Sequence, residues 1–172
     1  MKKLIFPLLT LFCTGCMNIP QNRLPIEGFN IEKYMGKWYE IARLDHSFER
    51  GLSQVTAEYT LIGNGQVKVV NRGYSQQKGQ WSQATGKAKF AGDKNTGHLK
   101  VSFFGPFYAS YIIFELDKTN YQFAYVSGKN PNYLWFLSRT PIVSEQDQQR
   151  FRARAKAAGF DTEKLIFVDH EG

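Results

Sequence analysis

The sequence is poor in cysteine: its 172 residues include only Cys13 and Cys16, which lie three positions apart near the N-terminus. A zinc site on this pair would need two further ligands, and His46, His98 and His170 are scattered singly. A thioredoxin-like C-x-x-C opens a helix after a strand, whereas this one closes a short apolar run. We therefore predict neither a metal site nor a redox centre, and no cofactor.

Long apolar runs are also missing. The N-terminal run over residues 4–12 is interrupted by Pro7 and is too short for the roughly 20 residues that cross a bilayer as a helix. Lys2 and Lys3 precede it. A positive start followed by a short apolar stretch is the layout of an export signal, so we expect this segment to be absent from the mature domain.

The end of this signal, Thr14-Gly15-Cys16, resembles a bacterial lipoprotein signal, in which small residues precede a cysteine that is lipidated and becomes residue one. The resemblance implies cleavage of residues 1–15, a lipid anchor on Cys16 and a tether over residues 16–30. Met17 follows the anchor, which implies the outer membrane, and we expect its periplasmic face. Cys13 stands where leucine is usual. An ordinary secretory signal cleaved nearby is the alternative.

Acidic residues are outnumbered, with 15 Asp and Glu against 22 Lys and Arg, a formal net charge of +7. Cleavage would remove Lys2 and Lys3 and leave +5. An excess of basic residues favours binding to an anionic membrane surface or to a nucleic acid. We expect contact with the membrane and no nucleic acid, because the basic residues 150–156 fit a solvated helix face better than a nucleic-acid motif.

Aromatic residues are plentiful, at 15% of the chain, and they favour sheet surfaces. Short runs with turn residues between them recur at steady spacing, and several alternate apolar and polar side chains, which indicates antiparallel strands with one wet face. The expected strands cover residues 38–44, 55–62, 66–73, 81–90, 98–105, 108–117, 121–128 and 132–139. The predicted class is all-β, an eight-stranded antiparallel up-and-down barrel.

One helix is expected after the strands. Ser144 is a candidate N-cap, Gly159 a candidate stop, and Phe151, Ala155 and Ala158 form a narrow apolar stripe suited to lying on the barrel wall. Residues 165–170 read as a short ninth strand. No second domain is expected.

Three motifs occur in order. Gly36-Lys37-Trp38-Tyr39 resembles the G-x-W-Y signature of the lipocalins, residues 116–121 resemble their T-D-Y-x-x-Y turn, and Ser138-Arg139 matches their third block. The stretches WYEIARLDHSFERG, KVSFFGPFY and YLWFLSRTP are similar to the bacterial outer-membrane lipoprotein members of that family. The resemblance runs from Phe29 to the end and implies a lipocalin domain over residues 31–172.

The resemblance also implies site residues. Trp38 and Arg139 are expected to close one end of the barrel, by cation–π attraction. The first hairpin loop, residues 45–54, is expected to overhang the open end, with Phe48 and Leu52 gating access. Alternation, with the family's in/out phase, assigns the following residues to the ligand cavity: Glu40, Ala42, Val55, Ala57, Tyr59, Val69, Asn71, Ala84, Ala88, Val101, Phe103, Tyr111, Tyr133, Trp135 and Leu137. A one-residue slip would invert any one strand.

The function implied is non-covalent enclosure of a fatty acid or lysophospholipid by a membrane-anchored carrier, with a role in envelope lipid storage, transport or maintenance. Arg43, Arg50 and Lys100 are candidate headgroup partners or ordinary solvated charges. We expect no enzyme and no catalytic residue. The alternatives are a lipid-modifying enzyme that uses His46 or Glu40, and an interaction module that uses the aromatic residues of 105–108. A homodimer is left open.

Overall fold

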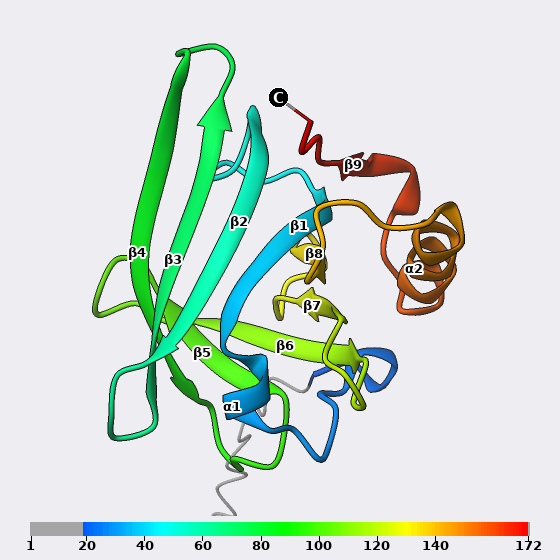
Figure 1. The fold of residues 1–172 in the computed structure, drawn as a ribbon. Helices are drawn as coiled ribbons and strands as arrows, with labels where there is room; N and C mark the ends of the chain where they lie inside the picture. The colour runs from blue at the N-terminus through cyan, green and yellow to red at the C-terminus, as the bar shows by residue number, and fades with distance from the viewer. Residues whose placement is uncertain (1–18, 172) are drawn as a thin grey trace, which may run out of the picture.

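The computed structural model describes residues 19–171, and its main body is the predicted barrel (Figure 1). Each strand pairs antiparallel with the next, and β1 pairs with both β2 and β8, which closes the sheet. The strands are β1 (Gly36–Leu44), β2 (Leu52–Leu61), β3 (Gln66–Ser75), β4 (Gln80–Phe90), β5 (His98–Ser102), β6 (Ala109–Leu116), β7 (Phe123–Ser127) and β8 (Leu134–Ser138). The all-β barrel prediction is confirmed.

Strand ends differ from the sequence reading in places. The fifth strand, expected to reach residue 105, stops at Ser102 because the chain turns, with Phe107 N–H donating to the Phe104 carbonyl at 3.2 Å. The second strand starts at Leu52, so the first hairpin loop is residues 45–51, and assigning Leu52 to that loop was wrong. The predicted helix is α2 (Glu145–Ala157), and the ninth strand, β9 (Leu165–Phe167), is shorter than expected.

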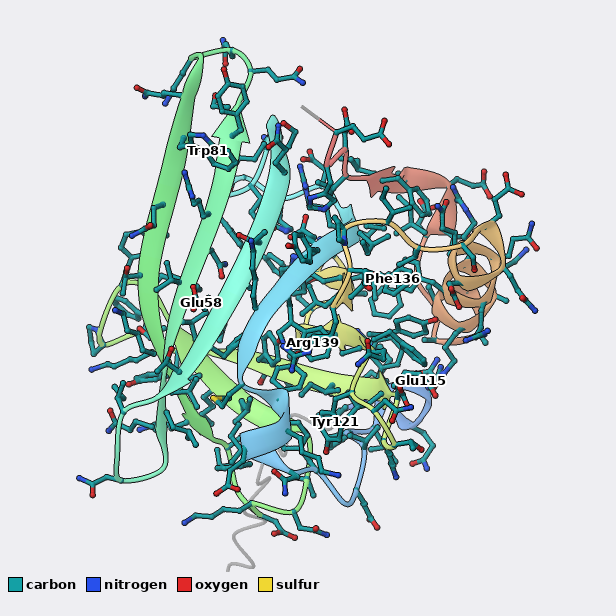
Figure 2. The ribbon with its side chains drawn as sticks, viewed as in Figure 1. Glu58, Trp81, Glu115, Tyr121, Phe136 and Arg139 are labelled. Atoms are coloured by element: carbon teal, nitrogen blue, oxygen red, sulfur yellow. The ribbon has the colours of Figure 1, made fainter. Side chains whose placement is uncertain are left out.

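The apolar core has two parts, one inside the barrel and one between its outer wall and α2. In the outer core the Phe151 ring lies 4.9 Å from that of Tyr125 and 5.0 Å from that of Phe136. Figure 2 shows Phe136 between the barrel and α2. The helix starts at the predicted cap, since the Asp147 N–H donates to Ser144 Oγ at 3.1 Å. Its predicted apolar stripe is the face that packs on the barrel.

The segment before β1 is bound to the fold rather than hanging free. It contains η1 (Gln21–Arg23) and α1 (Ile31–Tyr34). Ile19 packs against the outer core and Phe29 is part of the inner core. Part of the expected tether over residues 16–30 therefore contacts the domain, through Ile19, Ile26 and Phe29. Cys16 and the expected signal, residues 1–15, lie outside the described residues.

The remaining short element is η2 (Thr162–Lys164), which leads into β9. β9 pairs with the second half of β1, Ala42–Leu44, whereas β2 pairs with the first half, Gly36–Tyr39. Within residues 19–171, the helices all fall short of the length and apolar character that a membrane crossing requires.

Candidate ligand-binding site

The barrel interior is lined as strand alternation predicts, except on β1. Cross-strand pairs link one inward row across β1, β2, β3 and β4: Trp38 with Ala57, Ala57 with Asn71, Asn71 with Ala84. A second row joins Glu40 to Leu137. The same phase turns Val55, Tyr59, Val69, Ala88, Val101, Phe103, Tyr111 and Trp135 inward, as expected.

Ala42 was assigned to the cavity wrongly. The register of β1 against β8 shifts between Glu40 and Ala42, and such a bulge moves the following residues to the opposite face. Ala42 therefore packs in the outer core against α2. Its place inside the barrel is taken by Arg43, which pairs with Trp135 and is only 2% exposed.

The inward-facing side chains are buried at one end of the barrel and more exposed at the other. Near the α1 end, Trp38, Val67, Val69 and Ala88 are buried. Toward the opposite end, inward-facing side chains keep contact with solvent: Ala84 is exposed, and Asn71, Val101, Phe103, Tyr111 and Trp135 are partly exposed. These inward-facing side chains are therefore within reach of a molecule that enters from this end. The wall of this accessible part is mainly small and aromatic.

Trp38 and Arg139 close the filled end. The guanidinium carbon of Arg139 lies 3.8 Å from the centre of the Trp38 ring, which is fully buried. Arg139 also donates to the carbonyls of Lys33, Met35, Lys37 and Tyr121 at 2.8–3.2 Å. This one side chain thereby joins α1, β1 and the β6–β7 loop (Figure 2). A fork of five donors makes such multiple contacts possible.

Above this plug, three tyrosine hydroxyls form a chain. Tyr111 OH lies 2.7 Å from Tyr34 OH and 2.9 Å from Tyr59 OH. Burial raises the pKa of all three hydroxyls, so they stay protonated at neutral pH. They provide a neutral, hydrogen-bonding floor to the accessible part of the barrel.

Charged residues gather inside the barrel beneath the first hairpin loop. Arg43 donates from Nη1 to Glu40 Oε1 at 2.7 Å, and from Nη2 to the carbonyls of Glu49 and Leu52 at 3.0 and 3.1 Å. Glu49 Oε2 accepts from Trp135 Nε1 at 3.0 Å and lies 2.9 Å from His46 Nε2. The cluster thereby holds the loop to the barrel wall.

The pKa values of the two carboxyls in this cluster, Glu40 and Glu49, are shifted in opposite directions. Burial raises the pKa of Glu40 well above its usual value, the nearby Glu49 carboxyl raises it further, and Arg43 opposes both. Burial also raises the pKa of Glu49, but the hydrogen bonds with His46 and Trp135 and the positive charge of Arg43 outweigh burial and leave that pKa lowered. The cluster thus moves the pKa values of its two carboxyls apart.

Aromatic rings cover the cluster. Phe48 stacks on His46 with ring centres 4.0 Å apart, and His46 lies 5.7 Å from Tyr133 and 5.2 Å from Trp135. Phe48 is 54% exposed, so it forms the outer layer of a stack whose inner layer lines the barrel. The loop residue expected to gate access therefore rests on His46, and its ring centre lies 6.2 and 6.5 Å from those of the expected cavity residues Tyr133 and Trp135.

Sequence reasoning missed the charged cluster. It treated Glu40 as a lone inward carboxylate and Arg43 as a possible solvated charge, and it did not single out Glu49. Of the other headgroup candidates, Arg50 pairs with Asp45 on the surface and Lys100 faces outward on β5. Within residues 19–171 no group of three or more potential ligand side chains is arranged to hold a metal ion.

Comparisons with known proteins agree with this geometry. The family model described as a lipocalin-like domain matches residues 29–170. The chain belongs to the lipocalin family. Among lipocalins, it is 52% identical over 171 residues to the outer membrane lipoprotein Blc of Vibrio cholerae, covering 99% of this chain and all of that one. It is 46% identical over 153 residues to Blc of Escherichia coli K12, covering 89% and 86% of the two chains.

A solved lipocalin structure, insecticyanin from the tobacco hornworm, superimposes with a TM-score of 0.69 at 21% identity, covering 86% of this chain and 84% of that one. At this identity the likeness concerns the fold alone. The relationship to the Blc proteins extends through the N-terminal segment, and it places this lipocalin among lipid-anchored proteins of the bacterial outer membrane. Lipocalins are mainly binding proteins, which agrees with the open barrel.

Proposed function

We propose that this lipocalin binds a single-chain lipid, a fatty acid or a lysophospholipid, inside the barrel and acts as an envelope carrier. The observation that carries the proposal is the inward wall that keeps contact with solvent: Ala84, Val101, Phe103 and Trp135 face the interior and remain accessible above a closed floor. A long apolar chain fits a wall of small and aromatic side chains.

The energetics favour such a ligand. Each buried CH₂ group contributes about 0.8 kcal/mol, so a chain of twelve to eighteen carbons contributes several kcal/mol after the ordering costs of binding. The tail would lie along the apolar wall and the polar headgroup at the mouth. There the cluster of Arg43, His46 and Glu49 supplies donors and acceptors.

We infer binding without catalysis. No thiol exists beyond Cys16 in the sequence. His46 is stacked beneath Phe48 and beside Glu49, in contacts that hold the first hairpin loop to the barrel wall. The lipid anchor at Cys16 and a position facing the periplasm complete the proposal. The biological role proposed is storage, transport or maintenance of envelope lipids.

The test uses the soluble form that starts at Met17, purified from bacteria and analysed by native mass spectrometry with extraction of bound lipid. Two variants are matched on one strand: Ala84→Trp fills the accessible interior, and Thr85→Trp adds the same ring to the exposed outer face. Palmitate and lysophosphatidylethanolamine are then added to delipidated samples.

We expect one lipid per chain in the natural protein and in Thr85→Trp, and at least a tenfold weaker affinity in Ala84→Trp. A folded protein that takes up neither lipid would refute the carrier function. Equal uptake by both variants would refute the assigned cavity. Turnover of the lysophospholipid in the absence of metal would favour the enzyme alternative instead.

A further inference from the structure

The outer face of β3, β4 and β5 carries an array of lysines that oppose one another. Lys68 pairs with Lys87 across β3 and β4, and Lys89 pairs with Lys100 across β4 and β5. All four side chains are exposed. Like charges directly opposite each other on neighbouring strands are destabilising, so this arrangement calls for an anionic partner outside the chain.

The array has no acid on its own strands. From Tyr59 to Phe114 the sequence contains seven Lys and Arg residues and one acidic residue, Asp93. Asp93 lies in the loop between β4 and β5 rather than on a strand. On the neighbouring strand β2, Glu58 (Figure 2) lies opposite Val70 and not opposite a lysine. The positive charge of this face is therefore left without compensation on β3, β4 and β5.

Exposed aromatic rings adjoin the lysines. Phe104 and Phe107, at the two ends of the turn between β5 and β6, are 81% and 79% exposed. Tyr108 follows them, and Lys89 Nζ lies 4.7 Å from the centre of its ring. Figure 1 shows this turn projecting on the side of β4. Large apolar side chains at such exposure mark an interaction site.

We propose that this basic–aromatic face, formed by Lys68, Lys87, Lys89, Lys100, Phe104, Phe107 and Tyr108, docks on an anionic phospholipid bilayer. Lysines pair with lipid phosphates while their stems and the aromatic rings enter the interfacial layer. A double-stranded nucleic acid would use the lysines but not the two phenylalanines, and a single strand, whose bases can stack on aromatic rings, is not what an outer-membrane lipoprotein meets. A bilayer uses both, and the relationship to outer-membrane lipoproteins puts one within reach.

The docking surface is distinct from the cavity but joined to it by one loop. Phe103 faces the barrel interior, packed over Gly86, where an added Cβ would lie 2.8 Å from its ring. Phe104, the next residue, is on the exposed turn. The inference rests on the outer face alone and holds whatever occupies the barrel.

The test follows the depth of a spin label in the acylated, full-length mature protein, reconstituted into vesicles of phosphatidylethanolamine and phosphatidylglycerol at a ratio of about 3:1. With Cys16 acylated, Phe107→Cys supplies the only free thiol for a nitroxide. Ile142→Cys is the matched control, since Ile142 is 67% exposed and precedes α2, away from the proposed face. We expect the nitroxide at 107 to be reached by oxygen from the bilayer, and that at 142 by an aqueous nickel chelate.

Removing charge separates electrostatic docking from attachment by the anchor. Lys87→Gln with Lys89→Gln is expected to lower the ratio of docked to undocked protein by about 25-fold, about fivefold for each cation. The control pair, Lys118→Gln with Lys156→Gln, removes two exposed lysines elsewhere and is expected to have no such effect. Phosphatidylcholine vesicles are expected to weaken docking at least as strongly as the loss of Lys87 and Lys89, because they remove the anionic partner of all four lysines.

Three results would overturn the proposal. One is full aqueous access at position 107 in anionic vesicles. Another is docking that survives the loss of Lys87 and Lys89. The third is dipolar broadening between labels at 107 in the absence of vesicles, which would show that a second copy of the chain covers this face.

Discussion

Glu40 and Glu49 share one buried cluster beneath the mouth loop, yet their carboxyl pKa values move in opposite directions. Burial dominates at Glu40, whereas at Glu49 the contacts with His46, Trp135 and Arg43 outweigh it. The pKa values of two carboxyls in one cluster are thus moved apart by their different surroundings. The difference has consequences for stability as the pH changes.

We predict opposite pH trends for Glu40→Gln and Glu49→Gln. A raised folded pKa means that ionising Glu40 costs stability above the unfolded value of about 4.3. Glu40→Gln should therefore gain stability relative to the natural protein as the pH rises from about 4 to 8. A lowered folded pKa means that Glu49 stabilises the fold above about pH 4.3, and this contribution is lost as the pH falls through its folded pKa. Glu49→Gln should therefore show a deficit at pH 7 that shrinks toward pH 3.

Urea denaturation of both variants and the natural protein from pH 3 to 8 checks these trends. Each variant serves as the control for the other, because both change Glu to Gln in one cluster. Parallel pH curves for the two variants would contradict the assigned directions.

Some residue roles were predictable and others were not, for a geometric reason. The Arg139–Trp38 stack follows from a motif, and the structure has it at 3.8 Å. The Glu40–Arg43 pair has no such signal, because residues three apart on a regular strand point to opposite faces. Only the register shift after Glu40 brings them to the same side. Strand alternation without the bulge therefore predicts that Arg43 is exposed to solvent, whereas the bulge places it inside the barrel.

At the scale of elements, alternation predicted which side chains face the barrel interior on the regular strands β3 and β4, and it failed at the bulge in β1. β3 and β4 pair without a shift over their whole length, and the inward positions expected there are inward. On β1 the bulge turns the side chain of Ala42 from the expected inner face to the outer face of the barrel. The expected N-cap and apolar stripe of α2 are both present, since they depend on local spacing. An extra residue in a strand leaves no comparable pattern in the sequence.

Gly86 tests how closely β4 and β5 approach. A Cβ at Gly86 would lie 2.6 Å from the Ser102 carbonyl oxygen, whereas one at Gly92 would meet nothing within 4 Å. We predict that Gly86→Ala lowers the free energy of unfolding by about 1–3 kcal/mol, the usual range for overpacking, and displaces Phe103. Gly92→Ala should stay within about 0.5 kcal/mol.

Denaturant unfolding of the two glycine variants makes the comparison. Alanine has the better strand propensity, so propensity alone predicts a gain at Gly86. A stabilised Gly86→Ala would show that the strands separate at little cost, and the tight contact would then not shape the cavity wall.

At the scale of the whole molecule, the two outer sides of the barrel differ. α2 covers β1, β6, β7 and β8 through the outer core, and β3 and β4 lie on the other side of the barrel (Figure 1). That uncovered side carries the lysine array and the exposed turn. One sequence thus builds an apolar helix-covered wall and a basic uncovered one. Composition gives the net charge of the chain but not the concentration of basic residues on one side of the barrel, because that depends on which strands become neighbours.

Attachment to the envelope by acyl chains is expected to depend on one of the two cysteines, both of which lie outside the described residues. Cys16 follows the small residues Thr14 and Gly15, whereas Cys13 follows bulky Phe12. We predict that Cys16→Ser abolishes acylation and shifts the protein from the membrane to the soluble fraction of the cell. Cys13→Ser should leave attachment intact, because that residue leaves with the signal. Each buried CH₂ of the acyl chains contributes about 0.8 kcal/mol, so no surface contact of the domain can replace them.

Fractionation, with intact-mass measurement of the purified protein, distinguishes the two cysteines. The natural protein and Cys13→Ser should carry the mass of two or three acyl chains, and Cys16→Ser none. If Cys13→Ser were released instead, the anchor would be three residues further from the packed segment that begins at Ile19. If both variants stayed on the membrane without acyl chains, the basic–aromatic face alone would hold the protein there.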